Sequence, residues 1–198
     1  SISPPSRAEK KAALLKAMQA LASYGLTSVH DAGIDHENLT LYKELIKHNK
    51  MPIRINAMLY LPSDNWQNIL AQGTYKSDND MLAFNSVKIQ ADGALGSRGA
   101  ALINDYSDQH HHKGLLLHNN KALDEYIEIA MLAGFQVNTH AIGDNANKIV
   151  LDSYEKLIKK TDTKHLRHRV EHAQILRLSD IPRFSQLGVI ASMQATHA

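Results

Sequence analysis

The feature that most constrains the fold is a regular alternation of short apolar segments with longer amphipathic ones. Apolar residues at helical spacing predict helices, and short apolar runs between turn residues predict buried strands. The predicted strands lie at residues 26–30, 52–60, 84–91, 135–139, 169–173 and 189–193. The predicted helices lie at residues 6–25, 38–48, 63–71, 121–132, 144–160 and 179–186. This alternation is typical of parallel βα units, in which helices cover the sheet.

Two architectures are built from such units, and the residues at the strand ends distinguish them. A doubly wound sheet concentrates its chemistry at one switch point, whereas a (β/α)₈ barrel gathers it at the carboxyl ends of many strands. Five of the six predicted strands end in polar residues, which include His30, Asp31, Lys88, Asp92, His140, Asp144, Glu171, His172, Gln174, Gln194 and His197. The strand ends therefore favour a barrel.

Two histidines at strand ends are the strongest candidates for metal ligands. His140 and His172 occupy the same place in successive βα units, so on a barrel their imidazoles would converge at the mouth. Neutral imidazole is a common ligand for Zn²⁺ and similar ions. A single histidine at a strand end is more often a hydrogen-bonded core residue, but two in register favour metal ligation.

Lys88 lies inside an apolar strand, and lysines are rarely buried unless something pairs with or neutralises them. It either faces water on an edge strand or has a pKa lowered by burial. In the second case it serves as a Schiff-base amine, a general base or, after reaction with carbon dioxide, a carbamate that bridges two metals. The residues alone leave these alternatives open. Nearby, Arg169 and Glu171 share one strand face and are candidates for an internal ion pair.

The longest irregular segment runs from Asp92 to about Asn119, and loops of this length are usually functional. Residues 93–99 do not have the spacing of a phosphate-binding loop, so we expect a mobile turn or close approach to a ligand there. The histidines at 110–112 are expected in a solvated loop. Surface roles are expected for His36, His48, His118, His165 and His168.

The composition excludes several classes of protein. The 22 Lys and Arg residues and 20 Asp and Glu residues give a net charge of +2, without the basic clusters that nucleic acid or an anionic membrane requires. The absence of cysteine excludes disulfides and thiolate zinc sites. No apolar run approaches the roughly 18 residues of a membrane span. We expect neither nucleic acid nor a membrane as partner; the compartment is not fixed, and a cytoplasmic location is favoured.

Five ordered motifs resemble the amidohydrolase superfamily, in the YtcJ-like branch of amidohydrolase family 3 that is related to N-substituted formamide deformylase. They are GLTSVHDAG (25–33), VKIQADGALGSRGAAL (87–102), THAIGDNAN (139–147), RVEHAQ (169–174) and SMQATHA (192–198). The resemblance implies a metal-dependent hydrolase on a (β/α)₈ TIM barrel. Its reaction would be attack of metal-activated hydroxide on a carbon–nitrogen bond of a small, amide-like substrate.

The resemblance also implies roles for residues at the strand ends. Lys88 matches a lysine that can be carboxylated to bridge two metals, and His140 and His172 match metal ligands. Asp92, Gln194 and His197 would touch the substrate or the ligands. One or two divalent ions are expected, with Zn²⁺ as the first choice and Fe or Mn²⁺ as alternatives.

The family's His-x-His and its last-strand aspartate have no counterpart in this sequence. We therefore expect residues 1–198 to form a partial barrel domain covering strands two to seven, without the small β domain and inactive alone. Exposed strand edges predict self-association into a homo-oligomer. The alternative is a non-catalytic α/β module that binds a ligand or a subunit.

Overall fold

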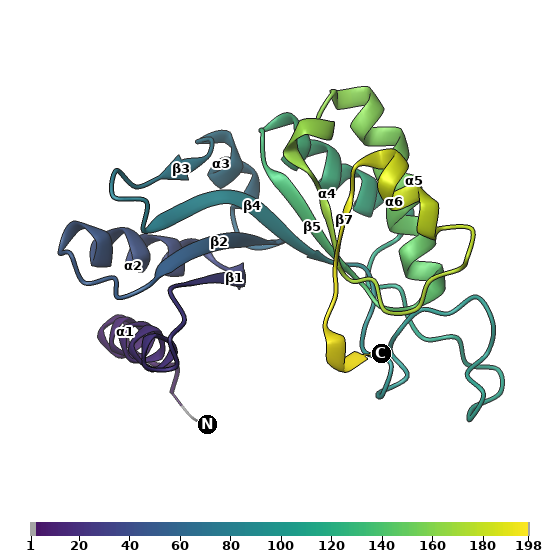
Figure 1. The fold of residues 1–198 in the computed structure, drawn as a ribbon, viewed down its shortest axis with the longest axis horizontal. Coiled ribbons are helices and arrows are strands. Elements are labelled where there is room, and N and C mark those ends of the chain that lie inside the picture. The colour runs from purple at the N-terminus through teal and green to yellow at the C-terminus, as the bar shows by residue number, and fades with distance from the viewer. Residues whose placement is uncertain (1–2, 198) are drawn as a thin grey trace.

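Six parallel strands form one curved sheet in the computed structural model, which describes residues 3–197 and so omits both ends of the predicted 1–198 domain. The strand order is β1-β2-β4-β5-β6-β7, and the short β3 pairs antiparallel with β4. The strands are β1 (Ser28–Ile34), β2 (Arg54–Leu61), β3 (Tyr75–Lys76), β4 (Leu82–Gln90), β5 (Gln136–Ala141), β6 (Arg169–His172) and β7 (Ile190–Ser192). Within the described residues the sheet does not close (Figure 1), so the predicted incomplete barrel is confirmed.

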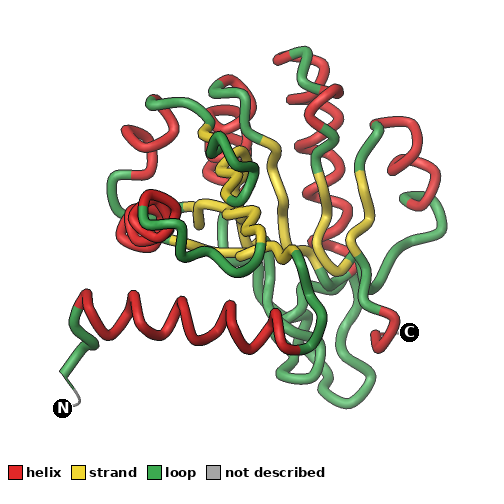
Figure 2. The backbone as a smooth tube through the Cα atoms, turned by 60° about the vertical axis from the view of Figure 1, so that its left-hand side comes forward, coloured by secondary structure: helices red, strands yellow, loops and turns green. Residues whose placement is uncertain are grey.

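Helices cover the outer face of this sheet, as Figure 2 shows. They are α1 (Arg7–Ser23), α2 (His36–Lys47), α3 (Trp66–Ala71), α4 (Asn120–Leu132), α5 (Asp144–Thr161) and α6 (Ile181–Leu187), with single 3₁₀ turns at Lys164–Leu166 and Ala195–His197. Ser6 caps α1 through a capping box with Glu9, as its place before the predicted helix suggests. No helix among residues 3–197 has the length and hydrophobicity needed to cross a membrane.

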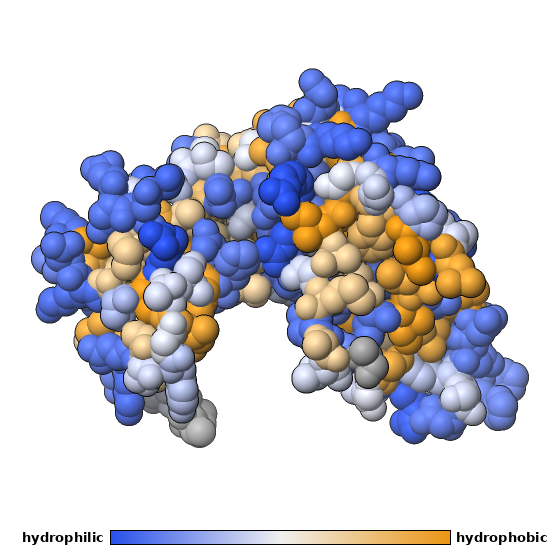
Figure 3. All heavy atoms as spheres, in the orientation of Figure 1, coloured by the Kyte–Doolittle hydropathy of each residue, from blue (hydrophilic) through white to orange (hydrophobic). Residues whose placement is uncertain are grey.

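The two faces of the sheet differ in polarity because side chains alternate along each strand. In β4, Val87 and Ile89 are fully buried in the hydrophobic core under the helices, whereas Lys88 lies on the other face. That inner face lines the hollow of the arch seen in Figure 3. Register places Lys88 beside Asn138 of β5 and Asn138 beside Arg169 of β6, so the inner face carries polar residues on consecutive strands.

The sequence predicted every long strand and helix, with differences at the boundaries. The strand at β1 extends to Ile34, and β7 is only three residues long. The two-residue β3 was not predicted, because a segment that short carries no periodicity. The 92–119 segment is irregular, as expected, and contains only an isolated bridge between Asp92 and Leu116 and one between Tyr106 and Gln109.

Tyr154 of α5 ties the helical layer to two strands. Its side chain is fully buried, and its hydroxyl donates to the backbone oxygen of Arg169 at 2.8 Å. The same hydroxyl lies 2.9 Å from Thr139 Oγ1.

We expect Tyr154→Phe to lower the free energy of unfolding by about 1–3 kcal/mol, because the buried oxygens of Arg169 and Thr139 lose a hydrogen-bond partner. Chemical denaturation measures this, and Tyr24→Phe, at an exposed tyrosine, should leave stability unchanged.

His168 is not a surface residue, contrary to the expectation from sequence. It is 1% exposed; its Nδ1 accepts the Val137 N–H at 3.0 Å, and its Nε2 lies 3.2 Å from Thr163 Oγ1. The position just before a strand conceals this burial, because the residues that enclose the ring come from β5, from α5 and from Thr163, which precedes the 3₁₀ turn. Burial lowers the pKa of His168 to about 4.

This lowered pKa predicts a loss of stability in mild acid. In the unfolded chain the ring titrates near 6.5, so between about pH 6.5 and 4 the unfolded state binds the extra proton. The free energy of unfolding should fall by about 2 kcal/mol from pH 7 to pH 5. His168→Asn keeps an acceptor for Val137 and should remove most of this pH dependence in urea titrations. An unchanged slope would contradict the assignment.

Candidate functional site

The candidate site lies at the carboxyl ends of β5 and β6, where two histidines meet. His140 is the last but one residue of β5, and His172 is the last residue of β6. These strands are paired in parallel, so their ends share one edge of the sheet. The two imidazole rings are 4.6 Å apart between centroids, with an angle of 76° between planes. The structure therefore brings together the two histidines that the sequence singled out.

Each of these rings has one nitrogen engaged by the protein. His172 Nδ1 lies 2.7 Å from Gln194 Oε1, and because an amide oxygen only accepts, Nδ1 carries the proton of this hydrogen bond. His140 Nε2 lies 3.3 Å from Asp92 Oδ1. The remaining nitrogens, His172 Nε2 and His140 Nδ1, have no hydrogen-bond partner within residues 3–197 and are available to a ligand. Histidines that bind metals are usually held in this way through the second ring nitrogen.

A small cavity opens beside His172. It has a volume of about 250 Å³ and is lined by His172, Gln174, Met193, Gln194 and His197. The rings of His172 and His197 are 5.7 Å apart between centroids. Burial is the main cause that lowers the pKa of His172; the hydrogen bond to Gln194 opposes this effect, and the charge of Lys88 adds to it. A neutral imidazole is the form that can bind a metal.

Asp92 anchors the 92–119 loop to the start of α5. Its side chain is fully buried, and its carboxylate accepts the N–H groups of Ala101 at 2.9 Å, Ile142 at 3.0 Å and Gly143 at 2.8 Å. Its Oδ1 also lies 3.3 Å from His140 Nε2, so Asp92 contacts the ring of a candidate ligand directly. Because three backbone N–H groups already bind its oxygens, we interpret Asp92 as a residue that holds His140 in place and not as a metal ligand itself. Figure 1 shows the loop beside the C-terminal end of the sheet.

Lys88 is buried on the inner face of the sheet and is 7% exposed. Its Nζ donates a long hydrogen bond of 3.4 Å to the backbone oxygen of Ile89. Burial lowers the pKa of Lys88 to about 8, and the charge of Glu171 counteracts that effect. On the neighbouring strand, Asn138 stands in register with Lys88, and its buried Oδ1 has no hydrogen-bond partner among residues 3–197.

Arg169 and Glu171 form the internal ion pair that their spacing suggested. Arg169 Nε and Nη2 bind the two Glu171 carboxylate oxygens at 2.7 and 2.9 Å. Arg169 also reaches Ser192 Oγ at 3.1 Å and His30 Nδ1 at 3.0 Å. His30 belongs to β1, which is not adjacent to β6, so this contact spans the hollow of the arch.

Other candidate residues lie away from the two histidines. Asp31 accepts a hydrogen bond from Tyr42 of α2 and so faces the helical layer. Asp144 accepts the Ile103 N–H and fixes the loop to α5. The histidines at 110–112 are exposed or only half-buried, and His112 Nε2 lies 2.9 Å from the Arg98 backbone oxygen. These positions therefore serve local structure.

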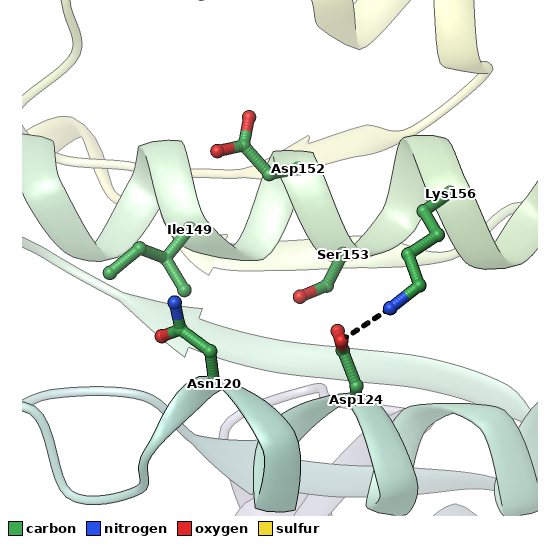
Figure 4. Close-up of a pocket in the computed structure, with 6 residues that line it drawn as sticks. All are labelled: Asn120, Asp124, Ile149, Asp152, Ser153 and Lys156. Carbon is green, nitrogen blue, oxygen red and sulfur yellow. Dashed lines mark hydrogen bonds and ion pairs between the residues drawn. The ribbon is translucent and has the colours of Figure 1, made fainter.

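Asn138 was not singled out from the sequence, although a signal was present. It stands two residues before His140, and residues two apart on a strand face the same side. The groove between α4 and α5 was not predicted either. It is about 130 Å³ in volume and contains a bridge between Lys156 and Asp124 (Figure 4), but no strand-end residue reaches it.

The donor groups at the strand ends fit a divalent cation in part. One nitrogen of each imidazole makes no hydrogen bond within the described residues, and the Asn138 oxygen without a partner there marks an unmet polar contact beside Lys88. However, no group of three or more His, Cys, Asp or Glu residues within 3–197 is placed to hold an ion. Tight binding would need further ligands or a chemically changed Lys88.

Comparison with known proteins places these motifs in one family. A sequence model of the amidohydrolase family matches residues 2–198. The chain is 32% identical to Protein LONG AFTER FAR-RED 3 of Arabidopsis thaliana, over 96% of this chain and 34% of that protein. It is 29% identical to YtcJ of Bacillus subtilis, over 98% of this chain and 36% of that protein.

A further relative and a solved structure agree with this result. N-substituted formamide deformylase of Arthrobacter pascens is 24% identical over 83% of this chain and 31% of that protein. A crystal structure of a metal-dependent hydrolase from Pyrococcus horikoshii has a TM-score of 0.83 at 26% identity, over 96% of this chain and 38% of that chain. The chain thus spans about a third of the length of the curated relatives it matches.

The role of Asp92 can be tested by Asp92→Asn. The amide would point its NH₂ group at backbone donors, and buried N–H groups would lose a charged acceptor. We expect the free energy of unfolding to fall by about 3 kcal/mol or more. Asp108→Asn removes an exposed carboxylate from the same loop and should leave the melting temperature unchanged. Equal effects of the two substitutions in thermal denaturation would contradict the anchoring role.

Proposed function

This chain belongs to the amidohydrolase family, and we propose that it carries part of the active site of a metal-dependent hydrolase acting on non-peptide carbon–nitrogen bonds. The substrate class would be small, amide-like molecules. The observation that carries the proposal is the convergence of His140 and His172, with ring centroids 4.6 Å apart and one nitrogen of each ring held by the protein. Two imidazoles prepared in this way are suited to share a cation.

We propose further that the six parallel strands are strands two to seven of an eight-stranded barrel. The unpaired edges of β1 and β7 in the described residues support this arrangement. The remaining ligands, a His-x-His pair and an aspartate, would then come from the first and last strands. Because residues 3–197 do not supply this His-x-His pair and aspartate at the site, we expect the 198-residue chain to be inactive by itself.

The residues of this chain would bind and orient the reacting groups. A divalent ion at such a site lowers the pKa of water to near 7 and so makes hydroxide available at neutral pH. His140 and His172 would hold the ion, while Asp92 and Gln194 keep the two rings in place. In the net reaction water adds to the amide carbonyl carbon, the carbon–nitrogen bond breaks, and an acid and an amine leave.

Lys88 would contribute a ligand after reaction with carbon dioxide. Burial lowers its pKa to about 8, so about a tenth of the amine is neutral at pH 7. The neutral nitrogen can form a bond to the carbon of carbon dioxide and release one proton to solvent. The resulting carbamate is an anion with two oxygen donors. Nitrogen and oxygen donors of this kind accept Zn²⁺, which is our first choice, and Fe or Mn²⁺ are the alternatives. Gln194 and His197, which line the cavity beside His172, would contact the substrate.

The proposal predicts a metal content that depends on the two histidines. Full-length protein should contain at least one divalent ion per chain by inductively coupled plasma mass spectrometry. His172→Ala should lower the metal affinity by about tenfold or more, because a direct ligand is lost. It should also abolish release of amine from a panel of N-formyl and N-acyl amines.

His118→Ala is the matched control for this experiment. His118 is a partly buried histidine whose ring packs against Tyr126 at 5.3 Å, outside the candidate site. We expect this variant to keep its metal. Full-length protein without bound metal would contradict the proposal and favour the alternative, a non-catalytic module that binds a ligand or a subunit. Metal retained by the His172 variant would place the ion elsewhere.

A further inference from the structure

We propose that Arg169 is a positioning residue that fixes His172 in the orientation needed for metal binding. The inference rests on the proposed function and adds to it a residue that does not touch the metal. Arg169 lies at the start of β6, three residues before His172. Its guanidinium bonds to Glu171, Ser192 and His30, which belong to β6, β7 and β1. One side chain thus links three strands across the hollow.

The need for such a support arises from the backbone at His172. His172 has a φ of 75° and the next residue, Ala173, has a φ of 44°, both in the left-handed region. Each such residue costs about 1–3 kcal/mol and persists only where its surroundings hold it. Neither residue is a glycine, so the conformation is imposed by the structure around it. The residue directly before this turn is Glu171, which is the one that Arg169 grips.

The geometry of this grip explains why it can hold the turn. Both carboxylate oxygens of Glu171 are bound by the guanidinium fork, which fixes the plane and the direction of the carboxylate. The side chains of Arg169 and Glu171 are 13% and 10% exposed, so water competes little with the pair. Because Arg169 is also tied to β1 and β7, its guanidinium cannot follow a rotation of Glu171 without breaking those contacts, so Glu171 is held in one orientation. Arg169 therefore fixes the residue that directly precedes His172, and with it the end of β6.

The substitution Arg169→Lys tests whether the two parallel hydrogen bonds of the guanidinium matter, or only its positive charge. Arg169→Lys keeps a positive charge but offers a single point of attachment instead of two parallel hydrogen bonds. It should therefore keep the fold while loosening Glu171 and the turn at His172. Arg183→Lys is the matched control, because Arg183 is 16% exposed and pairs with the buried Asp180 at 3.1 Å, in α6 and away from the histidines.

The experiment is a Co²⁺ titration of full-length protein followed by its visible absorption, whose intensity reports coordination geometry. We expect Arg169→Lys to weaken Co²⁺ binding by about tenfold to 100-fold, the usual effect of losing support behind a ligand. Its absorption bands should change as well. Arg183→Lys should bind Co²⁺ with the wild-type affinity and spectrum, even if its melting temperature falls as much as that of Arg169→Lys.

Two outcomes would overturn the inference, and they are distinguishable. If the wild-type protein binds Co²⁺ and Arg169→Lys binds it with unchanged affinity and spectrum, Arg169 has no positioning role and the proposed function stands. If the wild-type protein binds no Co²⁺, the proposed function fails together with the inference. Arg169→Met provides the second variant, and we expect it to weaken Co²⁺ binding at least as much as Arg169→Lys.

Discussion

Burial of one face of the sheet under helices is the constraint on which the rest of this structure depends. Alternation along each strand then sends the intervening residues to the inner face, where Lys88 and Glu171 are almost as buried as the core. Charges withdrawn from water must be paired or change their protonation state. Arg169 pairs with Glu171, whereas Lys88 lacks a close counter-ion among the described residues and its pKa falls instead. The chemistry of the inner face follows from this difference.

A second constraint joins the 92–119 loop to β5, the strand that carries His140. The Asp92 carboxylate collects backbone N–H groups from the loop and from the turn between β5 and α5. The Ala101 backbone oxygen accepts from Asn145 and Ala146 at the start of α5. Gly143 leaves no room for a larger residue, because a Cβ atom there would lie 1.9 Å from the Ala101 oxygen. The loop, the start of α5 and His140 are therefore connected through Asp92, so a change in the loop would alter the position of the His140 ring.

The sequence predicts the fold well because periodicity records burial, and burial here follows a simple layered plan. It also predicts that His140 and His172 meet, since parallel strands end at one edge of the sheet. The family resemblance adds Gln194, which contacts His172. It could not predict that Asp92 is saturated by backbone donors, because those donors lie up to 51 residues away and meet it only after folding. The burial of His168 was missed for the same reason.

The orientation of His172 shows where pattern reasoning reaches its limit. Arg169 and Glu171 face the inner side and Val170 faces the core, so strict alternation would send His172 toward the helices. The left-handed turn at His172 and Ala173 interrupts that alternation, and the ring instead lies against His140. A period of two describes only a regular strand, and His172 lies where β6 stops being regular. What fixes the site is therefore the set of contacts that sustain the irregular backbone, and in β6 those contacts belong to Arg169 and Glu171.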